Sequence, residues 1–229
     1  MKWSVNDIYE VVKLLVRKNQ SGSISPKDLF YYWNIEQNMY HADIVGRWQN
    51  RNNGKTGENT GLLLNETILT DLSPFTINET LTITAHKVTK PDDFEYRLAM
   101  RIDGNIVYMI NAGQKSQVLD SVIDAPSTID GIYYALEYED YYDLLPTTLP
   151  TVAITELELD YIASCTDVKW GYTLDANDRP VYNPGTSVQP KWKQSTIVTI
   201  TKRTLTNLGV SYKDADFTNF GRQAQATGD

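Results

Sequence analysis

The densest group of chemically reactive side chains is the segment EYEDYYD at residues 137–143. Its four carboxylates lie among three tyrosines and belong to Glu137, Glu139, Asp140 and Asp143. Carboxylate oxygens are the ligands that hard cations prefer, and a carboxylate pair is the catalytic unit of most glycosidases. The segment lacks the glycine and the ligand spacing of a calcium loop. We therefore interpret it as a strand end with solvated acidic side chains.

Other candidates for catalysis or metal binding are few. The chain has one cysteine, Cys165, and two histidines, His41 in a predicted helix and His86 in a predicted strand. These cannot form a Cys-rich zinc site, and no G-x-S-x-G motif occurs. Residues 53–56 read NGKT like the end of a P-loop, but Gln49 stands where that motif requires glycine. We expect no catalytic residue, no metal and no cofactor.

The charge is unevenly distributed. The 229 residues include 21 basic and 29 acidic side chains, for a net charge of −8. Residues 116–168 hold eleven acidic and no basic side chains, whereas residues 1–55 and 169–229 each carry +3. A nucleic-acid binder would show a basic stripe instead, so specific DNA binding is not expected. The acidic region is either a solvated face, a surface that repels polyanions, or one that meets the basic ends of a neighbouring copy.

Two helices are predicted within residues 1–50. Ser4 and Asp7 have the spacing of a capping box, and apolar residues recur at helical spacing after them. Ser25, which precedes a proline, marks the start of the second helix. The Ser/Gly segment between them is typical of an antiparallel helical hairpin. Residues 51–61 contain no side chain suited to a core and are predicted to form a flexible loop.

Residues 62–163 are predicted to be β-rich, because apolar and polar side chains alternate in several short runs. In residues 156–161, leucine and tyrosine alternate with acidic residues, so the acids should share one face. Asp103-Gly104 lies between two such runs and is typical of a type I′ hairpin turn. A change of phase predicts a bulge or bend near Thr155.

Residues 164–229 combine an irregular segment rich in aromatic residues and proline with a last helix over about 195–208. Gly209 fits the glycine that commonly follows a helix. We expect this region to form one domain with residues 1–50. The predicted fold class is α+β, in which a helical hairpin and a C-terminal helix pack with a sandwich- or barrel-like middle.

No run of about 18 apolar residues occurs, so no membrane span is predicted. The first residues, MKWSVNDIYE, lack the apolar segment of a signal peptide. We therefore expect synthesis in the cytoplasm and no membrane partner.

Two blocks of sequence carry a resemblance to a known family. The first is DIYEVVKLLVRKNQSGSISPKDLFYYWNIEQNMY; the second runs from LELDYIAS through DVKWGYTLDANDRPVYNPGTSVQPKW to STIVTITKRTLTNLGVSYKD. Together they cover about 110 of the 229 residues. The order and type of these elements resemble the ring proteins that stack below the portal in crAss-like bacteriophages of gut bacteria. Residues 56–150 have no match in this pattern, and Ser164-Cys165-Thr166 stands where the family often has a proline.

The resemblance implies a non-enzymatic virion protein, a subunit of a closed, portal-matched, dodecameric ring in the neck or tail barrel of a short-tailed phage. Its partners would be further copies, the portal, and neighbouring ring or tail proteins. Genomic DNA would pass through the ring without specific binding. The protein would be made in the host bacterial cytoplasm and reside in the neck or tail of the virion.

Two groups of residues are predicted to serve such an assembly. Aromatic side chains are enriched at subunit contacts; the residues predicted there are Trp33, Tyr40, Trp48, Trp170, Tyr182 and Trp192. Acidic side chains are predicted to face the lumen or another subunit; they are Glu137, Glu139, Asp140, Asp143, Glu156, Glu158 and Asp160.

Two other interpretations stay open. The tyrosine-rich strands and the aromatic segment are suited to a fibre-associated or carbohydrate-binding module of the virion, with their rings as sugar platforms. A third possibility is an enzyme that acts through paired carboxylates.

Overall fold

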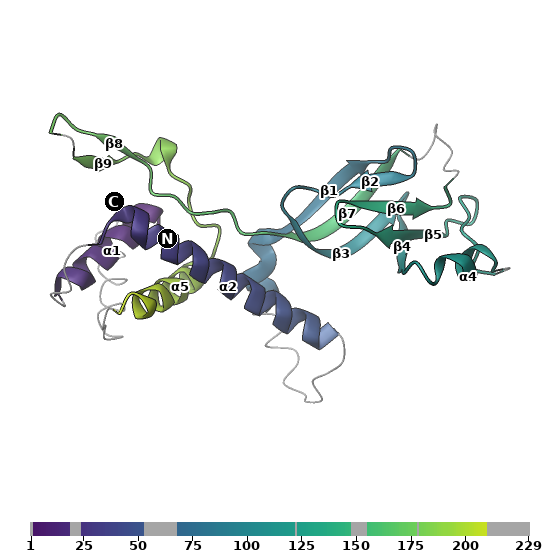
Figure 1. The fold of residues 1–229 in the computed structure, drawn as a ribbon, viewed down its shortest axis with the longest axis horizontal. Coiled ribbons are helices and arrows are strands. Elements are labelled where there is room, and N and C mark those ends of the chain that lie inside the picture. Colours follow the sequence, from purple (N-terminus) through teal and green to yellow (C-terminus); the bar gives the residue numbers. More distant parts are fainter. Residues whose placement is uncertain are drawn as a thin grey trace. The chain divides into compact units, whose positions relative to one another are not determined.

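The computed structural model describes residues 2–18, 24–52, 68–121, 123–147, 155–177 and 179–209. The chain divides into two compact units. Unit 1 joins Met1–Pro74 to Cys165–Asp229, and unit 2 is Phe75–Ser164. The fold is α+β, with helices in unit 1 and a nearly closed, mixed sheet in unit 2, as the sequence predicted (Figure 1).

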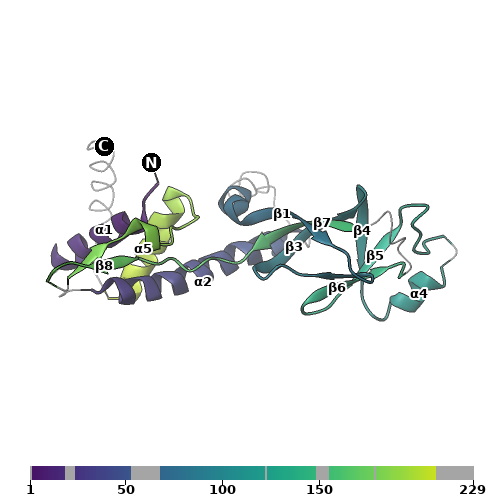
Figure 2. The ribbon, with the colours of Figure 1, turned by 90° about the horizontal axis from the view of Figure 1, so that it is seen from above.

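Unit 1 is mainly helical where the structure describes it. Its helices are α1 (Val5–Lys18), α2 (Pro26–Asn52) and α5 (Gln194–Asn207). α5 lies beside α2 in both views (Figures 1 and 2). The segment predicted to be irregular contains a short ribbon, in which β8 (Tyr172–Leu174) pairs with β9 (Pro180–Tyr182) before the 3-10 helix η2 (Pro184–Thr186).

Both N-terminal helices begin with the caps that the sequence predicted. The amide of Asp7 donates to the Ser4 hydroxyl at 3.2 Å, and the amide of Ser4 donates to the Asp7 carboxylate at 2.7 Å. This reciprocal pair is a capping box. At the start of α2, the amide of Asp28 donates to the Ser25 hydroxyl at 3.1 Å. These bonds satisfy amides that have no partner inside the helix.

The core of unit 1 is built from apolar faces of the three helices. Fully buried side chains include Val5, Ile8, Val12, Leu29, Ile197, Ile200 and Leu205. Two backbone amides at the start of the chain donate to side chains of the C-terminal segment. The amide of Trp3 donates to Gln194 at 2.6 Å, and the amide of Val5 donates to Gln189 at 2.8 Å. Residues far apart in sequence therefore form one core.

The β-rich part begins later than predicted. Residues 68–72 are helical, and they are followed by the 3-10 helix η1 (Ser73–Phe75). Leu72 and Phe75 are buried, so this stretch contributes to the core as helix and not as strand.

Unit 2 contains a seven-stranded sheet in the order β1-β7-β3-β4-β5-β6-β2. Its strands are β1 (Thr76–Thr82), β2 (Lys87–Thr89), β3 (Phe94–Ile102), β4 (Asn105–Ile110), β5 (Tyr133–Glu137), β6 (Tyr141–Leu145) and β7 (Glu156–Ala163). β4 and β5 pair in parallel, and the other neighbours are antiparallel. The short helix α4 (Lys115–Leu119) follows β4.

Two tight turns shape the sheet. Asp103 and Gly104 have φ of +48° and +79°, which agrees with the predicted type I′ turn. Ala85 and His86 also have positive φ, and they join β1 to β2 between Thr84 and Lys87. His86 therefore lies in a turn and not in a strand, so that prediction was wrong. The sequence signal for this turn is weak, because His occurs at positive φ more often than most residues but Ala does not, and the pair lacks the Asn-Gly or Asp-Gly pattern.

The core of unit 2 fills the sheet interior. On β7, Leu157 and Leu159 are fully buried while Glu156 and Glu158 are exposed, as the alternation predicted. β3 departs from simple alternation, because its register against β7 shifts twice.

Three predictions fall wholly or partly outside the described residues. These are the loop beyond Asn52, the NGKT segment, and the bulge or bend near Thr155.

Candidate functional site

Unit 1 contains a groove of about 970 Å³, formed entirely by its own residues. One wall is the start of α2, where Tyr31 lies; the other is the segment 168–180, which includes β8. Most of the lining surface is apolar. We call this hollow the aromatic groove, because Tyr31, Trp170 and Tyr172 all line it.

The segment that forms the second wall is held on α2 by side-chain amides. Asn34 donates to the carbonyl of Val168 at 3.0 Å and accepts from the amide of Val168 at 2.9 Å. One turn further along α2, Gln37 donates to the carbonyl of Thr166 at 3.1 Å. An irregular segment needs such bonds because it lacks the hydrogen-bond ladder of a strand.

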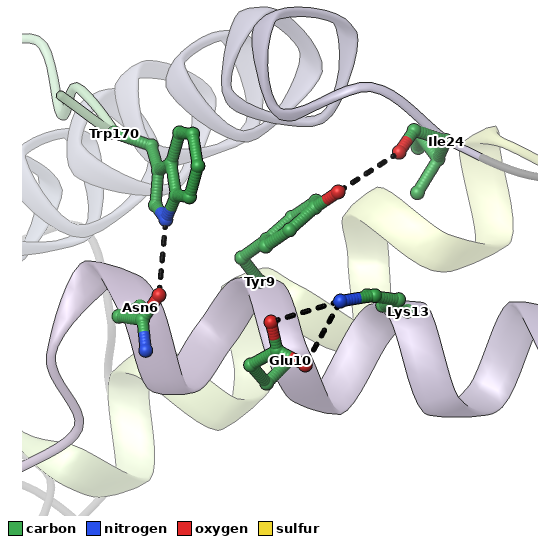
Figure 3. Close-up of polar contacts among 6 residues, drawn as sticks. All are labelled: Asn6, Tyr9, Glu10, Lys13, Ile24 and Trp170. Carbon is green, nitrogen blue, oxygen red and sulfur yellow. Dashed lines mark hydrogen bonds and ion pairs between the residues drawn. The ribbon is translucent and has the colours of Figure 1, made fainter. Parts of the chain in front are cut away.

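Trp170 is the fixed part of the groove. Its indole nitrogen donates to Asn6 on α1 at 3.1 Å, and its ring lies 5.2 Å from that of Tyr9 (Figure 3). Tyr9 in turn donates to the carbonyl of Ile24 at 3.5 Å. The indole also stacks with Tyr172, at 5.9 Å between centroids. The groove is thus preformed by contacts to α1.

Apolar side chains extend from the groove onto the surface. Tyr31, Ile35 and Met39 are exposed and spaced four residues apart, so they form one stripe along α2, with Tyr31 exposed to 65%. Leu174 and Val181 of the β-ribbon are also exposed. Contiguous exposed apolar surface of this kind marks contact sites in soluble proteins.

Among the described residues, three charged side chains line the groove, two basic and one acidic, and the exposed Asp167 and Asp175 adjoin its lining residues in sequence. Lys27 and Lys169 line it and are exposed, and Arg179 precedes the lining residue Pro180. The carboxylate of Asp28 accepts a hydrogen bond from the Ser25 hydroxyl at 2.6 Å. Asp28 is therefore engaged at the helix start, where the helix dipole favours a negative charge.

Unit 2 has an exposed apolar surface of its own. Tyr108 of β4 and Tyr134 of β5 have ring centroids 5.9 Å apart, and Ile106 and Tyr108 are exposed. Ile123 and Ile129, in the loop before β5, are 84% and 94% exposed. We call these five side chains the isoleucine patch.

Comparison with known proteins identifies no family. A scan against protein-family models gives no match, and neither does a search of curated proteins.

Three tryptophans predicted at subunit contacts lie inside unit 1. Trp33 and Trp192 are fully buried, and Trp170 is buried as well. The indole of Trp33 donates to Thr201 at 3.2 Å and that of Trp192 donates to Gln37 at 3.3 Å. Trp33 and Trp192 have no exposed surface to offer a second copy, so the structure places them in the core and not at a contact. Trp170 lines the aromatic groove, so for it the interface prediction stays a prediction. The bulk of a tryptophan suits a core as well as an interface, and the sequence does not distinguish the two.

The other predicted contact residues are partly accessible. Tyr40 is half-buried and donates to Asp71 at 3.4 Å, with Arg203 over its ring. Burial and the nearby Asp71 carboxylate raise the pKa of Tyr40, so it stays protonated. Trp48 and Tyr182 are also half-buried. The interface prediction for these three residues stays a prediction.

The predicted acidic cluster is divided among several partners. Glu137 pairs with Lys90 at 2.9 Å and with Arg97 at 3.1 Å. Asp143 is nearly buried, and its carboxylate lies 3.3 Å from the His86 imidazole nitrogen. These acids are bound within unit 2, so they contribute less negative charge to the surface than the sequence suggests.

The remaining acids of the cluster are more accessible. Exposed members are Glu139 and Asp140, in the turn between β5 and β6, and Glu156 and Glu158 on β7. Asp160 accepts from Asn78 at 2.6 Å and from Arg101 at 2.7 Å. The Asn78 amide and the Arg101 guanidinium hold the pKa of Asp160 below its usual value, against the opposing effect of burial. Whether any of these acids faces a lumen stays a prediction.

The remaining reactive side chains do not assemble into a site. His41 is buried beside the Trp192 ring, 5.9 Å between centroids, and Cys165 is half-buried. Within the described ranges, no group of three or more metal-binding side chains occurs. Across the same residues, no helix is long and apolar enough to cross a membrane.

Sequence analysis missed the exposed residues that define both surfaces. The stripe of Tyr31, Ile35 and Met39 has a clear signal, since its spacing repeats every four residues beside the buried face of α2. Ile123 and Ile129 have no such signal, because they lie in a loop without periodicity.

Proposed function

We propose that this chain is a non-enzymatic structural subunit of a virion. It forms a closed, portal-matched, dodecameric ring in the neck or tail of a short-tailed phage, and it contacts the portal and adjacent ring or tail proteins. The observation that carries the proposal is the exposed apolar surface formed by the aromatic groove and the stripe along α2. The type of assembly, a portal-matched ring, is inferred from the sequence resemblance described above.

The apolar surface favours a protein partner. Burying side chains such as Tyr31, Ile35 and Met39 releases about 25 cal/mol per Å² of apolar area removed from water. A stable interface needs roughly 800 Å² from each partner, and aromatic and methionine side chains are enriched in its centre. The groove is preformed by Asn34 and Trp170, so association costs little ordering of the chain.

The charge distribution is compatible with a DNA channel. Unit 2 holds fifteen acidic and five basic residues, whereas unit 1 holds fourteen acidic and sixteen basic residues. Protein–DNA affinity arises largely from basic groups that neutralise phosphates. A ring lined by unit 2 would therefore let genomic DNA pass without retaining it.

Quantitative mass spectrometry of gradient-purified virions tests this function. We expect a constant, portal-matched copy number relative to the major capsid protein, unchanged after a high-salt wash. Absence of the chain from the particle, or its removal by the wash, would overturn the proposal. Electron microscopy of the full-length protein should show closed rings.

A carbohydrate-binding role is the second candidate, and one observation favours it. Tyr172 is exposed and stacks on Trp170 at the edge of a groove that also contains Asp28 and Asn34. Sugar sites combine such flat aromatic faces with polar side chains. Binding to a glycan array that is lost in Tyr172→Ala but kept in Tyr108→Ala would support this role. Absence of any binding by the full chain would eliminate it.

A further inference from the structure

We propose that the isoleucine patch of unit 2 in one copy docks into the aromatic groove of unit 1 in a second copy. The inference rests on the proposed function, since it names the two surfaces that join neighbouring subunits. It makes the contact heterologous, so that every copy uses both surfaces. Repetition of such a contact gives a ring when the rotation closes.

Ring contacts and hydrogen bonds hold the strands and the loop of the isoleucine patch together. The rings of Tyr108 and Tyr134 pack together, and the hydroxyl of Tyr134 donates to the carbonyl of Asp124 at 3.0 Å. This bond holds the loop that carries Ile123 against the sheet. Gly131, at the end of the same loop, approaches Asn105 at the start of β4. The two exposed isoleucines therefore flank the exposed face of β4 and β5.

Ile129 is presented by a hydrogen-bonded turn. Ser127 and Ile132 exchange backbone hydrogen bonds at 3.0 and 2.8 Å, and the Ser127 hydroxyl donates to Asp130 at 2.6 Å. The turn fixes an isoleucine that is almost completely exposed to water. An apolar side chain held outward in this way is a preorganised anchor, because its backbone loses little entropy on binding.

The charges near the two surfaces favour contact between the patch and the groove. Exposed carboxylates adjoin the isoleucine patch in sequence: Asp124 and Asp130 follow its two loop isoleucines, and Asp103 lies in the turn before β4. Lys27 and Lys169, in contrast, line the aromatic groove. Contact between two patches would bring acids together, and contact between two grooves would bring lysines together. Patch against groove sets these acids opposite a lining with two lysines and one acid, and complementary potentials favour that pairing and speed association.

The apolar chemistry also matches. The groove offers the aromatic faces of Tyr31 and Tyr172 and the exposed Leu174, which suit the branched side chains of Ile123 and Ile129. A second copy is the occupant that supplies both the isoleucines and the adjoining acidic residues. An unrelated partner would have to reproduce both features.

Two complementary variants of the full chain test the inference. The groove variant carries Tyr31→Ser and Leu174→Ser, and the patch variant carries Tyr108→Ser and Ile129→Ser. All four side chains are exposed, so each variant should keep the wild-type circular dichroism spectrum. In the proposed interface these exposed side chains become buried. Removing two of them should weaken the affinity between copies by about 10²-fold or more.

Sedimentation velocity gives the decisive readout. Each variant alone should be monomeric at concentrations where the wild type assembles. An equimolar mixture should form a 1:1 heterodimer and nothing larger, because only one intact groove and one intact patch can meet. Control chains with Leu14→Ser or Tyr138→Ser, which remove exposed apolar groups outside both surfaces, should assemble like the wild type.

Three results would overturn the inference. They are a mixture that stays monomeric, a patch variant that still assembles alone, and a wild-type chain that is monomeric at every concentration. Virion mass spectrometry is independent of this outcome. A chain present at ring stoichiometry whose variants fail to pair would refute this docking and leave the ring function in place.

Discussion

The side chain of Asn34 exchanges two hydrogen bonds with the backbone of Val168, which lies 134 positions away in unit 1. The Asn34 amide nitrogen donates to the Val168 carbonyl at 3.0 Å, and the Val168 amide donates to the Asn34 oxygen at 2.9 Å. One side chain thus satisfies both backbone groups of Val168, as a strand partner would. Because Val168 lines the aromatic groove, the pair also positions the groove wall.

Asn34→Ala should destabilise unit 1. The substitution leaves the amide and carbonyl of the buried Val168 without these partners, at a cost of about 2–3 kcal/mol. All five tryptophans lie in unit 1, so urea unfolding followed by tryptophan fluorescence reports on this unit. Asn38→Ala, at an exposed position of the same helix, is the matched control and should change stability by less than about 0.5 kcal/mol. Equal losses in the two variants would contradict the proposed role of Asn34.

Two glycines should respond to alanine with opposite signs. Gly104 has φ of +79° in the β3–β4 turn, so Gly104→Ala should destabilise unit 2 by about 1 kcal/mol. Gly46 lies within α2 with open space around its added Cβ, so Gly46→Ala should stabilise unit 1 by about 0.5–1 kcal/mol. Hydrogen exchange of peptides from β3–β4 and from α2 measures the two effects separately. Stabilisation by Gly104→Ala would contradict the type I′ turn.

Asp160 should make unit 2 sensitive to acid. Its pKa is held below the usual value by Asn78 and then by Arg101. A carboxyl whose pKa is lower in the folded state stabilises the fold above its unfolded-state pKa, and this stabilisation disappears as the pH falls through the folded-state pKa. Asp160→Asn should therefore reduce stability at pH 7 and have a smaller effect near pH 2. Urea unfolding of unit 2, followed by far-ultraviolet circular dichroism at both pH values, measures this difference. An equal loss of unfolding free energy at the two pH values would rule out the ionised carboxylate as its cause.

The fold could be predicted from sequence wherever local signals and burial agree. Ser4 and Ser25 cap the helices because their spacing to an acidic residue three positions later is unambiguous. Leu157 and Leu159 alternate with glutamates, which fixes the face of β7. In each case the residues that decide the structure are neighbours in sequence.

Long-range partners decide the features that sequence analysis missed. The Ala85-His86 turn joins two sheet edges, and Leu144 donates to the carbonyl of His86 at 2.8 Å from a distant strand. Trp33 is a core residue because Thr201, 168 positions away, accepts from its indole. No local pattern distinguishes such a tryptophan from one on a surface, so the predicted interface included buried side chains.

A charge swap offers the last test of the docking between patch and groove. In the proposed docking, Asp124, next to the patch, faces the lysines of the groove, of which Lys169 is one. Asp124→Lys would then bring like charges together, and so would Lys169→Glu. Each single variant should weaken self-association by about two- to tenfold at low salt, because exposed pairs contribute roughly 0.2–1 kcal/mol and like charges oppose binding. The chain that carries both substitutions should recover most of the wild-type affinity.

Glu156→Lys, an equal charge change on β7 and outside the patch, is the control and should have a smaller effect on self-association. Sedimentation equilibrium at two salt concentrations measures these affinities, and additive losses in the double variant would place Asp124 and Lys169 in unrelated surfaces.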